Sequence, residues 1–190
     1  MVAVARDDKI EVETMPRRGT SETLMPAVRR LVAGGMRLDG VGVVVGPGSF
    51  TGVRVGLSAA KGLCEALGVG MVAMSRLALV TAAGSRKETL AMLDAGRNEY
   101  YCGVYRETTR VAEVLLNVED ARSAMEGRET ITCEARVAER VGARLVAEPG
   151  AASMLLLMKQ RVTAGDWSDI ESADANYLRR TDAELLRAVR

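Results

Sequence analysis

Histidine is absent from the 190 residues of this chain. Without imidazole, neither a Ser–His nor a Cys–His nucleophile pair can form, and a zinc site of the HExxH type has no ligands. A general base acting near neutral pH would therefore have to be a carboxylate or a lysine with a shifted pKa.

Cysteines and aromatic residues are also scarce. Cys64, Cys102 and Cys133 stand far apart and form no CxxC pair, so the sequence indicates neither a zinc knuckle nor a redox motif. Three isolated thiols are typical of a reducing compartment, so we expect a cytoplasmic protein. Aromatic residues make up 3% of the chain, which leaves Val, Leu, Ala and ten methionines to build the core.

Excess charge of either sign and long apolar runs are missing as well. The net charge is +1, whereas proteins that bind nucleic acid by themselves concentrate basic residues to neutralise phosphates. Two interpretations of Arg179, Arg180, Arg187 and Arg190 stay open: a nucleic-acid contact, or a solvated helix face. Residues 1–8 lack the apolar region of a signal peptide, and the longest apolar stretches are too short to span a membrane.

The order of hydrophobic patterns predicts an α/β chain. Two short strands at its start, 2–5 and 10–13, flank turn residues and predict a hairpin, and the Asp94–Asn98 segment predicts a second hairpin. We expect an N-terminal lobe at 1–94, to which 173–190 return, and a second lobe at 95–172. Further strands are predicted at 41–45, 70–73, 89–93, 100–105, 110–115, 130–132 and 144–146, and helices at 21–33, 53–67, 76–83, 119–125, 134–140 and 152–161.

The most informative segment is GPGSFTGVRVGLSAAK, residues 46–61, which predicts a strand, a glycine-rich turn and a helix. Free N–H groups at the start of a helix favour an anion. However, Thr51 occupies the third glycine position of a GxGxxG motif, and no Gly-Lys-Ser/Thr closes a Walker A loop. Two interpretations remain: an anion at Gly48, Ser49 and Thr51, or a plain helix cap by Ser49 or Thr51, which the spacing favours.

The helix after this turn carries small residues at i, i+4 spacing: Gly52, Gly56, Ala60 and Cys64. Glycine inside a helix is about 1 kcal/mol less favourable than alanine, so close packing has to offset that loss. The partner of the small-residue ridge is either the chain's own sheet or a helix of another subunit.

No side chain in the sequence stands out as catalytic. Ser49 or Thr51 would need activation by Lys61 or a carboxylate, since histidine is absent. Asp94 and Glu99 could form a carboxylate pair, but they flank a hairpin turn, where aspartate commonly bonds the local backbone. We therefore expect no catalytic residue and no metal site.

The run Gly46–Leu63 closely resembles the signature of the TsaB (YeaZ-like) family. Two weaker matches follow in the same order: Leu93–Tyr101 resembles the family's DAGR…EVY segment, and Tyr177–Arg180 resembles its C-terminal YLR motif. Upstream, Ser21–Pro26 resembles an HSExLLP segment, with Thr20 at the histidine position.

The resemblance implies an actin-like, ribonuclease-H-like fold of two lobes without independent catalysis. Members of the family are non-catalytic subunits needed for threonylcarbamoyl transfer to adenosine 37 of tRNA. They pair with TsaD, which holds ATP and metal, and with TsaE, and they form homodimers through the surface used for TsaD. This implies that the chain alone binds no cofactor and meets tRNA only indirectly. The implied partner surface lies on the first two predicted helices: Leu24, Val28, Leu31, Gly52, Val53, Gly56, Ala60, Leu63 and Cys64.

One departure concerns the start of the chain. The family normally begins with an apolar strand carrying an Asp-Thr pair, before the strand at 2–5, and this sequence lacks it. Because that strand is central in the family's sheet, we expect unpaired backbone groups and an exposed groove in its place. A truncated chain, or a start assigned too late, would account for the departure.

Two other functions are weighed against the scaffold. A stand-alone actin-like-fold ATP-dependent phosphotransferase or ATPase should carry Gly and Thr or Ser after the first-strand Asp, and Asp7-Asp8 offers no such hairpin. A peptidase of the metal-dependent type would lack its histidine ligands. Negligible ATP turnover by the purified protein would separate the scaffold from the ATPase.

Overall fold

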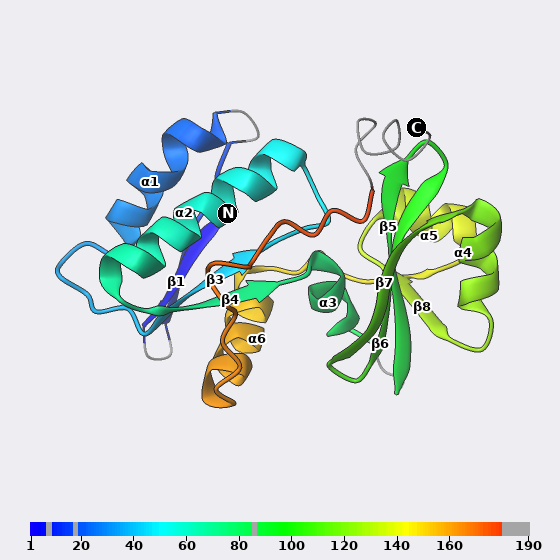
Figure 1. Cartoon of the computed structure of the whole chain (residues 1–190). Coiled ribbons are helices and arrows are strands. Elements are labelled where there is room, and N and C mark those ends of the chain that lie inside the picture. The colour runs from blue at the N-terminus through cyan, green and yellow to red at the C-terminus, as the bar shows by residue number, and fades with distance from the viewer. Residues whose placement is uncertain (7–8, 17–18, 85–86, 180–190) are drawn as a thin grey trace, which may run out of the picture. The chain divides into compact units, whose positions relative to one another are not determined.

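The computed structural model describes residues 1–6, 9–16, 19–84 and 87–179 of the chain (Figure 1). Contacts divide it into two units. Unit 1 comprises Met1–Leu79 and Pro149–Ala175, and unit 2 comprises Val80–Glu148 with the described residues from Asn176 onward. The expected lobes, 1–94 with 173–190 and 95–172, are corrected accordingly, because a cut at 94/95 would split a paired hairpin.

The strands of unit 1 form two separate pairs. β1 (Val2–Arg6) and β2 (Lys9–Glu13) are antiparallel, as the hairpin prediction required. β3 (Gly40–Val44) and β4 (Gly70–Met74) are parallel, which fits the apolar character of β3. Each pair is a two-stranded sheet.

Helices cover both faces of the β3–β4 pair. α2 (Phe50–Leu67) packs its Leu57 and Ala60 against Val43 and Met71. α6 (Ala151–Thr163) packs Met154 and Met158 against Val44 and Val72. Since successive side chains of a strand point to opposite faces, α2 and α6 lie on opposite sides of these strands.

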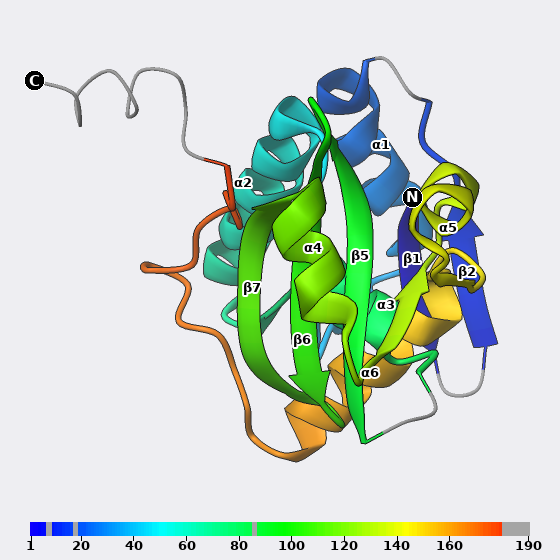
Figure 2. The ribbon, with the colours of Figure 1, turned by 90° about the vertical axis from the view of Figure 1, so that its right-hand side faces the viewer.

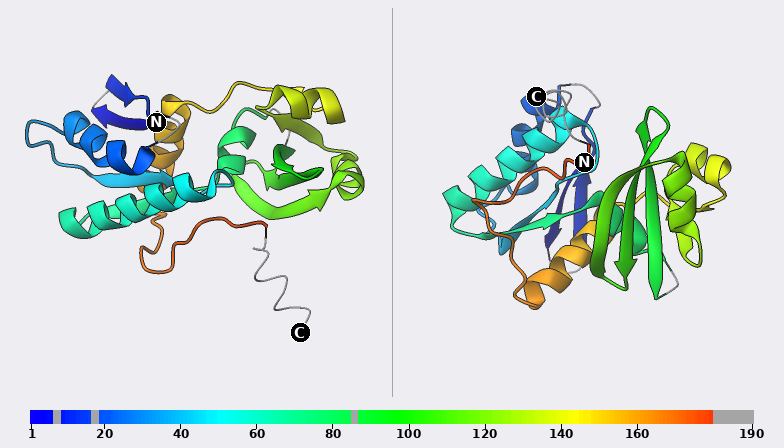
Figure 3. Two further views of the ribbon diagram at one scale, coloured as in Figure 1. Left: turned by 90° about the horizontal axis from the view of Figure 1, so that it is seen from above. Right: turned by 45° about the vertical axis from the view of Figure 1, so that its right-hand side comes forward.

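Two further helices complete the first half of the chain. α1 (Thr20–Leu31) contacts α2 and β1, and it continues through Pro26. α1 and α2 lie side by side (Figure 3). The short α3 (Arg76–Thr81) follows β4 directly and crosses the boundary between the units.

A segment after α6 covers one end of the β3–β4 pair. The backbone N–H of Ser168 donates to the carbonyl of Met71 at 2.8 Å. The Trp167 ring lies so close to Gly70 that a Cβ added there would be 2.3 Å from the ring, and one added at Gly40 would be 2.8 Å from it. Both positions therefore need glycine, and the sequence alone did not indicate why.

Unit 2 contains one continuous sheet in the order β7-β6-β5-β8-β9. Its strands β7, β6 and β5 lie side by side in Figure 2. The antiparallel meander of β5, β6 and β7 confirms the second hairpin and its predicted third strand. α4 and α5 supply Ala121 and Val137 to a core that also contains Leu90, Met92 and Tyr100. The bounds are β5 (Glu88–Gly96), β6 (Glu99–Arg106), β7 (Thr109–Asn117), α4 (Val118–Met125), β8 (Glu129–Thr132), α5 (Ala135–Val141) and β9 (Arg144–Leu145).

Within the described residues, no helix has both the length and the apolar character that a bilayer crossing requires.

Candidate functional site

The glycine-rich turn joins β3 to α2 and is used structurally. Gly46 has a φ of 105°, which favours glycine, and its carbonyl accepts a hydrogen bond from the N–H of Arg76 at 2.7 Å. Ser49 is the N-cap residue of α2, and its hydroxyl accepts a long hydrogen bond from the N–H of Gly52 at 3.4 Å. This confirms the capping interpretation. An anion at Gly48, Ser49 and Thr51, all three exposed, stays a prediction.

The small-residue ridge of α2 faces the strands of its own unit. Ala60 is 4% exposed and Cys64 1% exposed, both in the cluster that contains Val43 and Met71. A Cβ added to Gly56 would lie 3.9 Å from a methyl group of Val43. For Ala60 and Cys64 the structure therefore favours packing against the chain's own sheet over contact with a second subunit.

Of the other seven residues of the expected partner surface, all except Val53 line a groove inside unit 1. Leu31 is buried and Val53 is half-buried. The remaining five are half-buried and line a groove inside unit 1: Leu24, Val28, Gly52, Gly56 and Leu63. None of the nine is exposed.

The outer faces of α1 and α2 carry a different set of side chains. Met25 on α1 and Phe50 on α2 are 37% and 49% exposed. The guanidinium of Arg54 lies 4.1 Å from the centre of the Phe50 ring, a cation–π contact. Arg29 is also exposed on α1. Exposed hydrophobic side chains beside positive charge are typical of surfaces that bind a partner.

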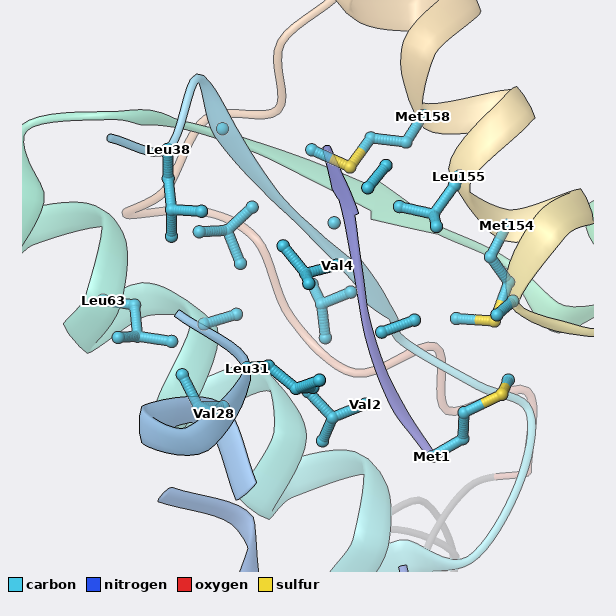
Figure 4. Close-up of a pocket in the computed structure, with 18 of the residues that line it drawn as sticks. Met1, Val2, Val4, Val28, Leu31, Leu38, Leu63, Met154, Leu155 and Met158 are labelled. Carbon is cyan, nitrogen blue, oxygen red and sulfur yellow. The ribbon is translucent and has the colours of Figure 1, made fainter. Parts of the chain in front are cut away.

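The groove in unit 1 has a volume of about 950 Å³. Its walls come from β1, β3, α1, α2 and α6, and its lining is apolar (Figure 4). The resemblance led us to expect an exposed groove where the family's first strand would lie.

The Asp94–Glu99 turn is held by local hydrogen bonds. The Asp94 carboxylate accepts from the N–H of Gly96 at 2.8 Å, and Arg97 and Asn98 have φ values of 54° and 60°. Two consecutive residues with positive φ are typical of a type I′ hairpin turn. The structural interpretation of Asp94 is thereby confirmed.

Arg179, from the YLR segment, binds this hairpin. Its guanidinium pairs with the Glu99 carboxylate at 2.6 Å and donates to the Ala95 carbonyl at 2.9 Å. Arg179 lies in no helix, so the expected solvated helix face is wrong at this position. Arg180, Arg187 and Arg190 lie outside the described residues.

The sequence did not reveal a second set of contacts in unit 2, which is made by Glu113. The Glu113 carboxylate, 3% exposed, accepts hydrogen bonds from the Tyr105 hydroxyl at 2.6 Å and the Asn176 amide at 2.5 Å. Arg110 lies 3.9 Å from the same carboxylate. Residue 176 is thus tied to β7, across a sequence distance that no local pattern reveals.

Lys61, considered above as an activating group, makes a structural contact, and two of the thiols are buried. The Lys61 ammonium donates to the Glu171 carbonyl at 3.1 Å. Burial raises the pKa of the Cys64 thiol, with the Glu65 carboxylate contributing in the same direction, and it raises the pKa of Cys102 to about 12. Within the described part of the chain, no three His, Cys, Asp or Glu side chains gather as metal ligands.

These elements define an α/β protein of the actin-like, ribonuclease-H-like class, with two units. Residues 14–128, more than half of the chain, match the model of the TsaD family, described as tRNA N6-adenosine threonylcarbamoyltransferase. The chain belongs to this family, and it is similar to TsaB (YeaZ) proteins.

Three relatives illustrate that similarity. The tRNA threonylcarbamoyladenosine biosynthesis protein TsaB of Bacillus subtilis is 34% identical over 55% of this chain and 49% of its own length. The protein of the same name from Haemophilus influenzae is 31% identical over 55% of this chain and 48% of its own length. The solved structure of YeaZ from Pseudomonas aeruginosa is 26% identical with a TM-score of 0.72, covering 93% of this chain and 92% of that one. The matched region spans about half the length of the curated relatives.

Proposed function

We propose that this chain is a non-catalytic subunit in the biosynthesis of threonylcarbamoyladenosine in tRNA, and that it acts by binding and activating a TsaD subunit. The proposal is carried by the similarity to TsaB proteins over 55% of the chain. In it, TsaD transfers the threonylcarbamoyl group to adenosine 37, while ATP and metal are held by the partner.

The use of polar groups inside this chain supports a scaffold role. Ser49 caps a helix, Asp94 holds a turn and Glu99 pairs with Arg179. Histidine is absent from the sequence. A scaffold needs none of these groups for chemistry, so it loses no function when they serve structural roles.

The proposed TsaD-binding surface is the outer face of α1 and α2. Met25, Phe50 and Arg54 are exposed there. Of the residues expected at the interface, Ala60 and Cys64 would support the surface from within, because they hold α2 against the sheet. The same face would form a homodimer when TsaD is absent, TsaE would join the complex, and tRNA would be reached indirectly.

Co-purification with a TsaD protein tests this function. Met25→Asp on α1 should abolish the complex, because it buries a charge in the interface. Leu156→Asp is the matched control: Leu156 is an exposed hydrophobic on α6 of the same unit, 60% exposed, and its substitution should leave the complex intact. Failure of the unsubstituted chain to bind TsaD would refute the proposal. ATP hydrolysis by the purified chain alone would favour the stand-alone ATPase instead.

A further inference from the structure

The outer edge of β2 is open. Among the described strands, β2 pairs only with β1. Four of its five residues are exposed, and they include Ile10 at 44% and Val12 at 48%. A strand placed at the free edge of β1 would lie on the opposite side of β1 from β2, so the outer edge of β2 stays open whatever fills the groove. An exposed edge strand with apolar side chains can pair with a further strand.

β2 also lacks the features that commonly block such pairing. Its register with β1 runs without a bulge over all five pairs, and its sequence, KIEVE, contains no proline. A sheet of only two strands gains hydrogen bonds and packing when further strands join it. The edge is therefore competent to accept another strand.

The two faces of β2 differ in character. Successive side chains of a strand point to opposite faces, so Ile10 and Val12 share one face, and Lys9, Glu11 and Glu13 share the other. The charged face is turned toward α1, because the Arg30 guanidinium donates to the Glu13 carboxylate at 3.2 Å. A partner strand must therefore offer apolar side chains on one face and matching charges on the other.

A second copy of β2 meets both requirements by symmetry. In antiparallel pairing about Glu11, Lys9 of each copy lies opposite Glu13 of the other, and Ile10 lies opposite Val12. Opposite charges and β-branched side chains in such cross-strand positions stabilise a sheet. This register uses all five residues of the strand. Its unfavourable contact is Glu11 opposite its own copy, and Arg30 supplies positive charge on the same face.

We propose that two copies of this chain associate through the outer edges of β2. The two hairpins then form one antiparallel sheet in the order β1-β2-β2-β1, with the inner strands from different copies. The contact is separate from the outer face of α1 and α2, to which we assign TsaD. A five-residue edge makes a small interface, so the association is weak and reversible. An unrelated strand would have to reproduce both the apolar pairs and the order of charges.

Sedimentation velocity over a concentration series tests the proposal. The full chain carries Met25→Asp, which removes self-association through α1 and α2, and it should still dimerise. Lys9→Glu and Glu13→Lys, each made in that chain, place like charges opposite one another at two positions. Each should weaken the dimer by about tenfold. An equal mixture of the two variants restores opposite charges at both positions, so mixed dimers should form with the affinity of the parent. Loss of the Glu13–Arg30 ion pair alone would not be rescued by mixing.

Two further substitutions and a control locate the contact. Glu11→Gln removes the central repulsion and should tighten the dimer several-fold. Val12→Asp should abolish it, whereas Val111→Asp, at a 53% exposed position on the edge strand β7 of unit 2, should leave it intact. Circular dichroism confirms that the variants are folded. The proposal is overturned if the Met25→Asp chain stays monomeric at every concentration, if mixing restores no dimer, or if the two valine variants behave alike.

Discussion

The two units contain similar elements but differ in how completely their strands are paired. In unit 2, β5, β6 and β8 each have a partner on both edges, and Leu90, Ala91, Met92 and Leu93 of β5 are at most 1% exposed. In unit 1, β1 has one partner and its residue Val4 is 8% exposed, while Ile10 and Val12 of β2 are 44% and 48% exposed. Apolar sequence alone does not complete a sheet; each edge needs a neighbour.

This difference in strand pairing predicts that unit 2 tolerates substitutions in its strands less well than unit 1. A strand paired on both edges buries side chains on both faces and backbone groups on both sides. The groove of unit 1 leaves these gains unrealised along β1 and β3, so substitutions there should be tolerated better than equivalent ones in unit 2.

The largest effect is expected from truncating the core of unit 2. Leu90 is fully buried, and Leu90→Ala should lower the free energy of unfolding by about 2–5 kcal/mol because it leaves a cavity. Leu63→Ala, which only widens the existing groove of unit 1, should cost clearly less. Urea denaturation followed by circular dichroism measures both. If both variants lost the same free energy of unfolding, the proposed difference in stability between the two units would be wrong.

A smaller effect should come from the ordered part of unit 1. Gly70→Ala places a Cβ 2.3 Å from the Trp167 ring, and the resulting shift of the ring should cost about 1–3 kcal/mol. Gly62→Ala, in open space on α2, should instead stabilise by up to about 1 kcal/mol. Thermal unfolding of the two variants provides the measurement, and Trp167 fluorescence should change only in the first. A stable Gly70→Ala protein with unchanged fluorescence would contradict the close packing.

Removing the hairpin anchor of unit 2 should have a weaker effect. Arg179→Ala deletes a partly exposed ion pair with Glu99 and a hydrogen bond to Ala95, worth together about 1 kcal/mol. Arg122→Ala, on the exposed side of α4, should stay within about 0.5 kcal/mol of the parent. Chemical denaturation compares them. If the two variants unfold at the same denaturant concentration, the contacts of Arg179 contribute nothing to stability.

The smallest effect at neutral pH concerns the thiols. Burial raises the pKa of Cys102 to about 12 and raises that of Cys64, so both thiols stay protonated in the folded chain when the unfolded chain ionises, near a pKa of about 8.5. Their contribution to stability is therefore fully present below that pH and declines above it, until the folded thiol itself ionises, which for Cys102 occurs near pH 12. A pH series of unfolding midpoints measures the decline. In the folded chain, Cys133, which is half-buried, should react first with a thiol reagent, and faster labelling of Cys102 would argue against its burial.

Local patterns predicted most elements but few of the contacts between them. The glycines around Ser49 indicated the strand, turn and helix, and the residues around Asp94 indicated a hairpin, since both signals depend on backbone conformations of neighbouring residues. The pairing of Arg179 with Glu99 spans 80 residues, a distance at which sequence spacing carries no geometric information. The boundary between the units was misplaced for the same reason, because only pairing shows that β5 and β6 cannot be separated.

The sequence by itself determined the α/β character, both hairpins, the capped α2 and the small-residue ridge along it, because these follow from propensity and periodicity within one segment. The tertiary structure decided that Ala60 and Cys64 of this ridge face the sheet of their own unit, that Trp167 requires glycine at position 70, and that β1 and β3 leave their edges open to one groove. Burial and strand pairing depend on which segment packs against a residue. That segment is often distant in the sequence, so the contact is fixed only when the chain folds.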